Sequence, residues 1–164
     1  MATVIKIDTP ALSGQGELSL REPFIKVEVE GGKKYRKWRL SLNIIQPPKV
    51  PVCDVHLTFE KKPKIWDSEE PNPKDPNANQ VKLEDFPPDW DSSYDEKTGV
   101  LKLEAKDCDT NKLRKALYSF SFLVEDQKTP VALGKVKVQL TDKAHTVILE
   151  SDPKNEKELA PAGG

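Results

Sequence analysis

Hydrophobic and polar residues alternate at a period of two through most of this chain. The clearest stretch runs from Gly99 to Glu150, where apolar positions recur at every second residue and Lys, Glu, Ser and Gln stand between them. Such alternation is typical of half-buried strands in an antiparallel sheet, with one face in the core and one in solvent. Turn-forming residues separate the runs, as in Asp95 to Gly99 and Asp126 to Pro130. The pattern therefore predicts an all-β fold.

Earlier segments repeat this pattern and complete the predicted fold. Alternating runs lie at 3–8, 17–20, 24–30, 35–45 and 50–60, and no segment carries a convincing apolar stripe of helical period. We count about eight or nine strands, which predicts one antiparallel β-sandwich of immunoglobulin-like architecture over residues 1–150. The polar residues 151–164 are expected to form a flexible tail.

The alternation also predicts which side chains form the core. We expect the following residues to be buried: Ile25, Val27, Val29, Trp38, Leu40, Leu42, Val55, Leu57, Phe59, Leu101, Leu103, Phe120, Phe122, Val136 and Val138.

Residues 61–98 interrupt the pattern as a long, acidic, proline-rich insertion. Six of the 14 prolines fall here, and residues 66–96 hold ten acids against two lysines, a local charge of −8. Loops of this length inside a compact domain are usually functional or disordered. Four aromatic residues argue against a plain linker, so we expect an arm that lays them on a surface of its own sandwich or of a neighbour. They are Trp66, Phe86, Trp90 and Tyr94.

A basic segment offers a complementary surface for this arm. Five of the seven residues from 33 to 39 are cationic, namely Lys33, Lys34, Arg36, Lys37 and Arg39. Such a stripe could contact phosphates, but the net charge of the whole chain is only −1, so no global field selects nucleic acid. A charged edge that opposes strand aggregation is the simpler interpretation. We predict that this stripe and the four arm aromatics bind a protein partner.

Reactive constellations are missing from the sequence. The chain has two histidines and two cysteines, with no Gly-x-Ser-x-Gly motif and no paired Cys-x-x-Cys or His-x-x-x-His zinc motif. We therefore expect no enzyme and no cofactor. Cys53 is in phase with Val55 and Leu57, so it is expected to be a buried thiol, while a bridge to Cys108 in its turn stays open. With no signal peptide or membrane span visible, these features favour a reducing, cytoplasmic location.

One acidic turn provides weak candidate metal ligands. Asp107, Asp109 and Asn111 stand at alternate positions, as oxygen ligands do in calcium loops, although an EF-hand would need other residues at its sixth and twelfth positions. The stretch 24–34 also resembles the lysine-ended early strand of calcium-dependent phospholipid-binding (C-two) domains, with Glu22 as the acid before the Pro-aromatic pair. That resemblance covers two short segments, and the family's first calcium-loop aspartates have no counterpart here.

Three functions remain open from the sequence. The favoured one is a non-enzymatic, protein-interaction or structural module that self-associates or binds a protein partner. The second is a calcium- or phospholipid-binding sandwich. The third is a ubiquitin-like modifier, because the chain ends in Gly163-Gly164, although those modifiers use a central helix that this sequence does not show.

Overall fold

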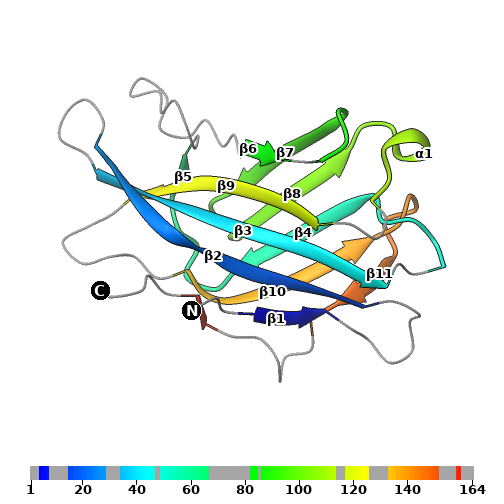
Figure 1. The fold of residues 1–164 in the computed structure, drawn as a ribbon, viewed down its shortest axis with the longest axis horizontal. Coiled ribbons are helices and arrows are strands. Elements are labelled where there is room, and N and C mark those ends of the chain that lie inside the picture. Colours follow the sequence, from blue (N-terminus) through cyan, green and yellow to red (C-terminus); the bar gives the residue numbers. More distant parts are fainter. Residues whose placement is uncertain are drawn as a thin grey trace.

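Two antiparallel β-sheets make up the structure, which is a computed structural model (Figure 1). The described residues are 4–7, 15–28, 34–46, 49–66, 82–84, 86–113, 117–125, 133–151 and 158–159. This confirms the predicted all-β, antiparallel fold class. The part of the chain described here contains no helix long and apolar enough to cross a membrane.

The first sheet is built around two long strands. Its order is β1 (Val4–Ile7), β2 (Gln15–Glu28), β3 (Lys34–Gln46), β9 (Leu117–Glu125) and β5 (Ile65–Trp66), with β6 (Lys82–Glu84) also paired to β9.

The second sheet has shorter strands. Its order is β11 (Val147–Glu150), β10 (Gly134–Thr141), β4 (Asp54–Phe59), β8 (Val100–Ala105) and β7 (Trp90–Asp95), and β12 (Glu158–Leu159) pairs with β10. The one-turn helix α1 (Cys108–Asn111) follows β8.

A single hydrophobic core takes side chains from both sheets. The predicted core residues whose side chains are described are all buried: Trp38, Leu40, Leu42, Val55, Leu57, Phe59, Leu101, Leu103, Phe120, Phe122, Val136 and Val138. The side chains of Ile25 and Val27, and the whole of Val29, lie outside the described residues. The period-two pattern thus selected the correct face of each strand that can be checked.

Strand β9 is buried on its second face as well. Ser119, Ser121 and Leu123 alternate with the core aromatics and are still at most 3% exposed. A polar position in the sequence pattern is therefore not always a solvated position. Alternation predicts which residues share a face, but not whether another part of the molecule covers it.

The predicted turn at 95–99 joins β7 to β8. Asp95 Oδ1 accepts a hydrogen bond from the Lys97 amide at 2.9 Å, and the Gly99 amide donates to the Asp95 carbonyl at 2.8 Å. Gly99 has a φ of 73°, and a Cβ there would lie 2.5 Å from the Phe59 carbonyl oxygen. Glycine is required at this position for both reasons.

The acidic insertion contributes strands to both sheets. Of residues 61–98, β5 and β6 pair with β9, and β7 pairs along its whole length with β8. Residues 67–81 and 85 lie outside the described residues. The described prolines of this region, Pro63, Pro87 and Pro88, lie between the strands rather than within them. At least the described parts of the arm are therefore elements of the fold.

Candidate functional site

The predicted basic stripe lies on β3, in the middle of the first sheet. Lys33 is outside the described residues, and Lys34, Arg36 and Lys37 are described only by their backbone register against β9 and β2. Arg39 is half-buried and pairs with Ser121 across the strands. Since β9 stands between β3 and the strands β5 and β6, the described parts of the arm border β9 rather than this stripe.

The arm aromatics with described side chains pack against the chain's own core. The Phe86 ring centroid lies 5.4 Å from Trp90, 5.1 Å from Tyr118 and 6.4 Å from Phe120. Trp90 and Tyr94 are 6% and 7% exposed.

The polar ends of both buried rings are hydrogen-bonded within the chain. The indole of Trp90 donates to the Asn111 carbonyl at 2.5 Å, and the Tyr94 hydroxyl donates to the Pro63 carbonyl. Burial raises the pKa of Tyr94 well above its ordinary value. Both rings therefore belong to the chain's own core, one of the two surfaces expected for the arm aromatics, and partner binding by them stays a prediction. Trp66 belongs to β5 and lies opposite Leu123 of β9. The side chain of Trp66 is not described.

The candidate metal ligands are engaged in other contacts. Asp107 caps α1, where its Oδ1 accepts from the Asp109 amide at 3.1 Å. Both carboxylate oxygens of Asp109 accept from the Lys143 ammonium at 2.9 Å, and this hydrogen bond holds the pKa of Asp109 below its ordinary value. The Asn111 amide donates to Asp89 at 3.2 Å and to Thr110 at 3.0 Å. Among the described residues, no group of three or more acidic, His or Cys side chains is arranged to hold a metal ion.

Cys53 and Cys108 form a disulfide, with their Cα atoms 5.4 Å apart. Cys53 is buried as predicted, at 3% exposure, but the interpretation of it as a free thiol is wrong. The two residues are 55 positions apart, and their approach depends on how β4 and α1 pack. Sequence periodicity carries no information on that distance.

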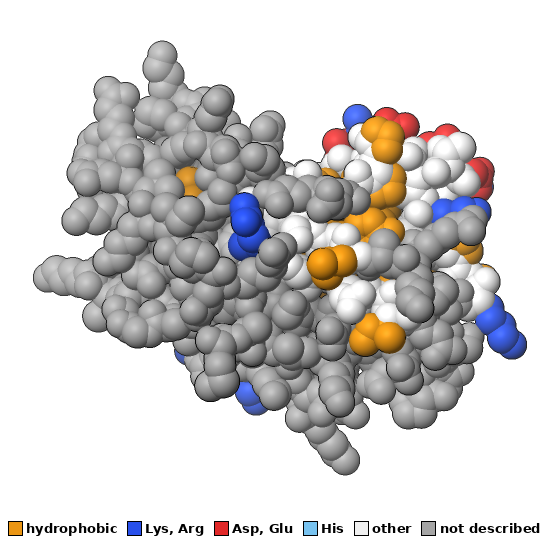
Figure 2. Space-filling view, in the orientation of Figure 1, with side chains coloured by type: hydrophobic (Ala, Val, Ile, Leu, Met, Phe, Trp, Pro, Cys, Tyr) orange, Lys and Arg blue, Asp and Glu red, His pale blue; other side chains and the backbone are white. Residues whose placement is uncertain are grey.

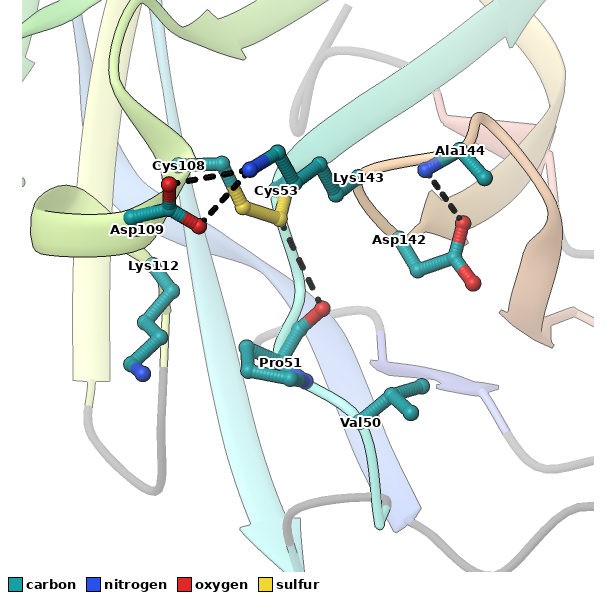
Figure 3. A pocket seen from close by; sticks show the side chains of 9 residues that line it. All are labelled: Val50, Pro51, Cys53, Cys108, Asp109, Lys112, Asp142, Lys143 and Ala144. Carbon is teal, nitrogen blue, oxygen red and sulfur yellow. Dashed lines mark hydrogen bonds and ion pairs between the residues drawn. A yellow bond between two sulfur atoms is a disulfide. The ribbon is translucent and has the colours of Figure 1, made fainter.

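Two cavities of about 250 Å³ adjoin this disulfide. Figure 3 shows the first, whose lining combines apolar and charged side chains; it is lined by Val50, Pro51, Cys53, Cys108, Asp109, Lys112, Asp142, Lys143 and Ala144. The second is more polar and is lined by Cys53, Asp54, Glu104, Ala105, Lys106, Cys108, Asp142, Lys143 and His145. The sequence offered no signal for either cavity, because the walls of each come from three separate chain segments.

A buried carboxylate organises the polar side of the second cavity. Asp54 is only 3% exposed, and its Oδ2 accepts from the Thr141 hydroxyl at 3.1 Å and from His145 Nδ1 at 2.9 Å. The His145 ring is largely exposed, and its backbone has a φ of 64°, the left-handed region that non-glycine residues rarely adopt. Asp54 thereby fixes the orientation of an exposed imidazole.

His56 lies on the same strand as Asp54, and both histidines of the chain are close to that carboxylate. Burial is the main cause that lowers the pKa of His56, and the charges of Lys102 and His145 add to it, while Asp54 and Glu104 act in the opposite direction. Its buried Nε2 has no hydrogen-bond partner. His56 is therefore expected to be neutral near pH 7.

Two of the exposed apolar side chains are neighbours across strands β3 and β9. The large hydrophobic residues exposed among the described ones are Ile45, Val50 and Leu117, at 41%, 42% and 55%. Leu117 opposes Asn43, so Ile45 is its diagonal neighbour across β3 and β9. Val50 begins the segment that leads to Cys53. Figure 2 shows hydrophobic side chains gathered at one side of this face, over α1 and the end of β3.

Comparison of the chain with protein-family models, with curated proteins and with solved structures found no match. The class that the structure defines is therefore an all-β protein of two antiparallel sheets. A fold class does not imply a function, so the function has to be argued from these surfaces.

Proposed function

We propose that this protein is a non-enzymatic interaction module, an immunoglobulin-like β-sandwich that associates with a second copy of itself. The observation that carries the proposal is the exposure of Ile45, Val50 and Leu117, of which Ile45 and Leu117 are diagonal neighbours across β3 and β9; we call these three residues the apolar end. Exposed apolar side chains that lie together are typical of protein contact surfaces, whereas single ones are ordinary.

Charge supports the same proposal. Residues 66–96 carry a local charge of −8, which leaves about +7 on the remainder of the chain. Two copies can therefore approach with an acidic region of one facing a basic region of the other. Complementary charge steers association and fixes orientation, while buried apolar area supplies most of the affinity.

The disulfide bears on where such a module would work. Disulfides persist in oxidising compartments and are rare where glutathione and thioredoxin keep thiols reduced. The Cys53–Cys108 bond therefore supports an oxidising location over the cytoplasmic one that the sequence favoured.

Molar mass measured by light scattering over a concentration series tests the proposal. We expect the mass to rise with concentration, and the rise to be weaker in high salt, which screens the steering charges. A protein that is monomeric at every concentration and salt level would contradict self-association.

Matched substitutions locate the contact. Val50→Thr together with Ile45→Thr should weaken association, because both make the apolar end polar with little change in shape. Val100→Thr makes the same kind of change at a half-buried position of β8, away from the apolar end, and should leave association unchanged. If the variant carrying Ile45→Thr and Val50→Thr and the control Val100→Thr change association equally, the contact lies away from the apolar end.

A further inference from the structure

The second sheet has two ends that differ in charge, and its strands run between them (Figure 1). The first is the end next to α1, where Lys143 of the loop after β10 binds Asp109 of α1 at 2.9 Å. We call it the α1 end and define it as residues 49–54, 89–91, 104–113 and 141–146. It holds seven acids against four lysines, a net charge of −3. A second of its lysines is also held by an acid of the same end, since Lys106 binds Asp91 at 3.3 Å.

Three turns meet at the opposite end of the sheet. The Phe59 amide donates to the Gly99 carbonyl at 2.8 Å, and the Glu60 amide donates to the Lys135 carbonyl at 2.9 Å. We call it the lysine end and define it as residues 60–64, 95–99, 133–137 and 158–159. It holds six lysines against four acids, a net charge of +2. Within the described part of the chain, no ion pair holds its five exposed lysines, which are Lys61, Lys62, Lys97, Lys135 and Lys137.

The α1 end also carries exposed apolar surface. Val50, a residue of the apolar end, lines a cavity together with Cys108 and Asp109 (Figure 3). Figure 2 shows acidic and hydrophobic side chains in the same region of one face, at its right-hand side. A lysine suits such a mixed surface, because its methylene stem packs on apolar atoms while its ammonium group reaches a carboxylate.

We propose that copies of this protein associate head to tail, with the α1 end of one copy on the lysine end of the next. This geometry rests on the self-association proposed above and specifies its two surfaces. Opposite charge draws the two different ends together, whereas two α1 ends or two lysine ends repel one another. The exposed lysines of one copy then bind the exposed acids of its neighbour, which are Asp89, Asp91, Asp107 and Asp109.

A head-to-tail contact does not stop at two copies. Each contact uses one α1 end and one lysine end, so a pair of copies still has one free end of each kind. Further copies add until the assembly closes into a ring or grows as an open chain. A two-fold symmetric dimer would instead use the same surface on both copies and would stop at two.

Mixing two variants of the full chain tests this geometry. The lysine-end variant carries Lys61→Gln, Lys97→Gln and Lys135→Gln. The α1-end variant carries Asp89→Asn, Asp91→Asn and Asp109→Asn. All six substitutions remove a charge from an exposed side chain, and melting temperatures check that both variants fold.

Each variant alone should associate about tenfold more weakly than the original protein, because about three exposed ion pairs are lost from the only contact it can make. Light scattering is therefore run at a concentration where the original protein associates and neither variant does. There the equimolar mixture should reach about twice the mass of one chain and rise no further. The intact α1 end of the first variant binds the intact lysine end of the second, and the two ends left over are the altered ones.

The control carries Lys49→Gln, Lys106→Gln and Lys112→Gln at the α1 end. It undergoes the same chemical change as the lysine-end variant, but it makes the α1 end more acidic, so association should not weaken. Equal weakening of the control and the lysine-end variant would reveal an effect of net charge alone and would overturn the proposal.

A mixture no heavier than either variant alone, while the original protein associates, would also overturn the head-to-tail geometry and leave self-association through another surface. An original protein that stays monomeric at every concentration would instead contradict the proposed function itself, and with it this geometry.

Discussion

Phe122 contacts aromatic rings of both sheets. Its ring centroid lies 5.8 Å from Phe59 of β4 and 6.4 Å from Phe120, its neighbour on β9. All three side chains are completely buried. A ring in this position excludes water from the centre of the core and fixes the spacing of the two sheets. Its loss would leave a cavity that the surrounding strands, held by their ladders, can fill only in part.

Phe122→Ala should lower the free energy of unfolding by about 3–5 kcal/mol, the usual effect of truncating a buried aromatic residue. Leu117→Ala on the same strand is the control, because its side chain is 55% exposed and its truncation should change stability by no more than about 0.5 kcal/mol. Denaturant unfolding at low protein concentration measures both. Similar losses from the two substitutions would contradict the assignment of the core face of β9.

His56 should make stability depend on pH. Its pKa is lowered in the folded state, so the unfolded chain binds a proton more readily. Stability is therefore unaffected above the unfolded value of about 6.5 and falls as pH decreases below it towards the folded pKa. His56→Gln should reduce the loss of melting temperature between pH 7 and pH 5. The effect of His56→Gln on the melting temperature at pH 8, where His56 is neutral in both the folded and the unfolded state, is the baseline. If the melting temperature of the variant falls between pH 7 and pH 5 as much as that of the original protein, His56 is not the cause of the pH dependence.

The strands β5 and β6 follow one edge of β9 as if they were one interrupted strand. Trp66 lies opposite Leu123, and Lys82 lies opposite Ser121, so only Phe122 separates their positions on β9. Both strands are antiparallel to β9 and therefore run in the same direction. By their register on β9, β5 and β6 are therefore two parts of one edge strand.

Replacing residues 67–81 with one glycine should therefore give a folded protein with β5 and β6 joined. One residue spans the remaining step of the ladder, since a strand advances about 3.3 Å per residue. Melting temperature and circular dichroism would test this. An unfolded product would contradict the inferred register.

The contrasting variant is a deletion of residues 71–88. This deletion removes β6 and the Phe86 ring that packs on Trp90 and Tyr118. We expect a loss of about 2–4 kcal/mol from the missing aromatic packing alone.

At the scale of the whole molecule, the charged loops next to α1 form their own contacts. Lys143 binds Asp109 across the gap between the β10–β11 loop and α1, and Asp107 caps the helix. A cation bound by these acids would have to displace Lys143. The arrangement therefore argues against a calcium site formed by these acids.

We predict that millimolar Ca²⁺ leaves the melting temperature unchanged. A site filled at 100 times its dissociation constant would stabilise the fold by about 2.7 kcal/mol, which a thermal shift detects readily. The control is the variant carrying Asp107→Asn and Asp109→Asn. Stabilisation by Ca²⁺ that this variant abolishes would restore the calcium-binding alternative.

The sequence by itself determined the class of fold and the inward face of each checked strand. These follow from alternation, because neighbouring side chains of a strand point to opposite faces whatever the strand packs against. The sequence also identified the turn at Gly99, because the conformation of a tight turn depends on the local backbone.

Only the tertiary structure decided the rest. It placed Trp90 and Tyr94 in the core of the chain's own fold, and it joined Cys53 to Cys108. It also brought Asp54 and His145, which are 91 positions apart, into hydrogen-bond contact. Each of these depends on which strands become neighbours, and that choice is made by the packing of two whole sheets rather than by any local pattern.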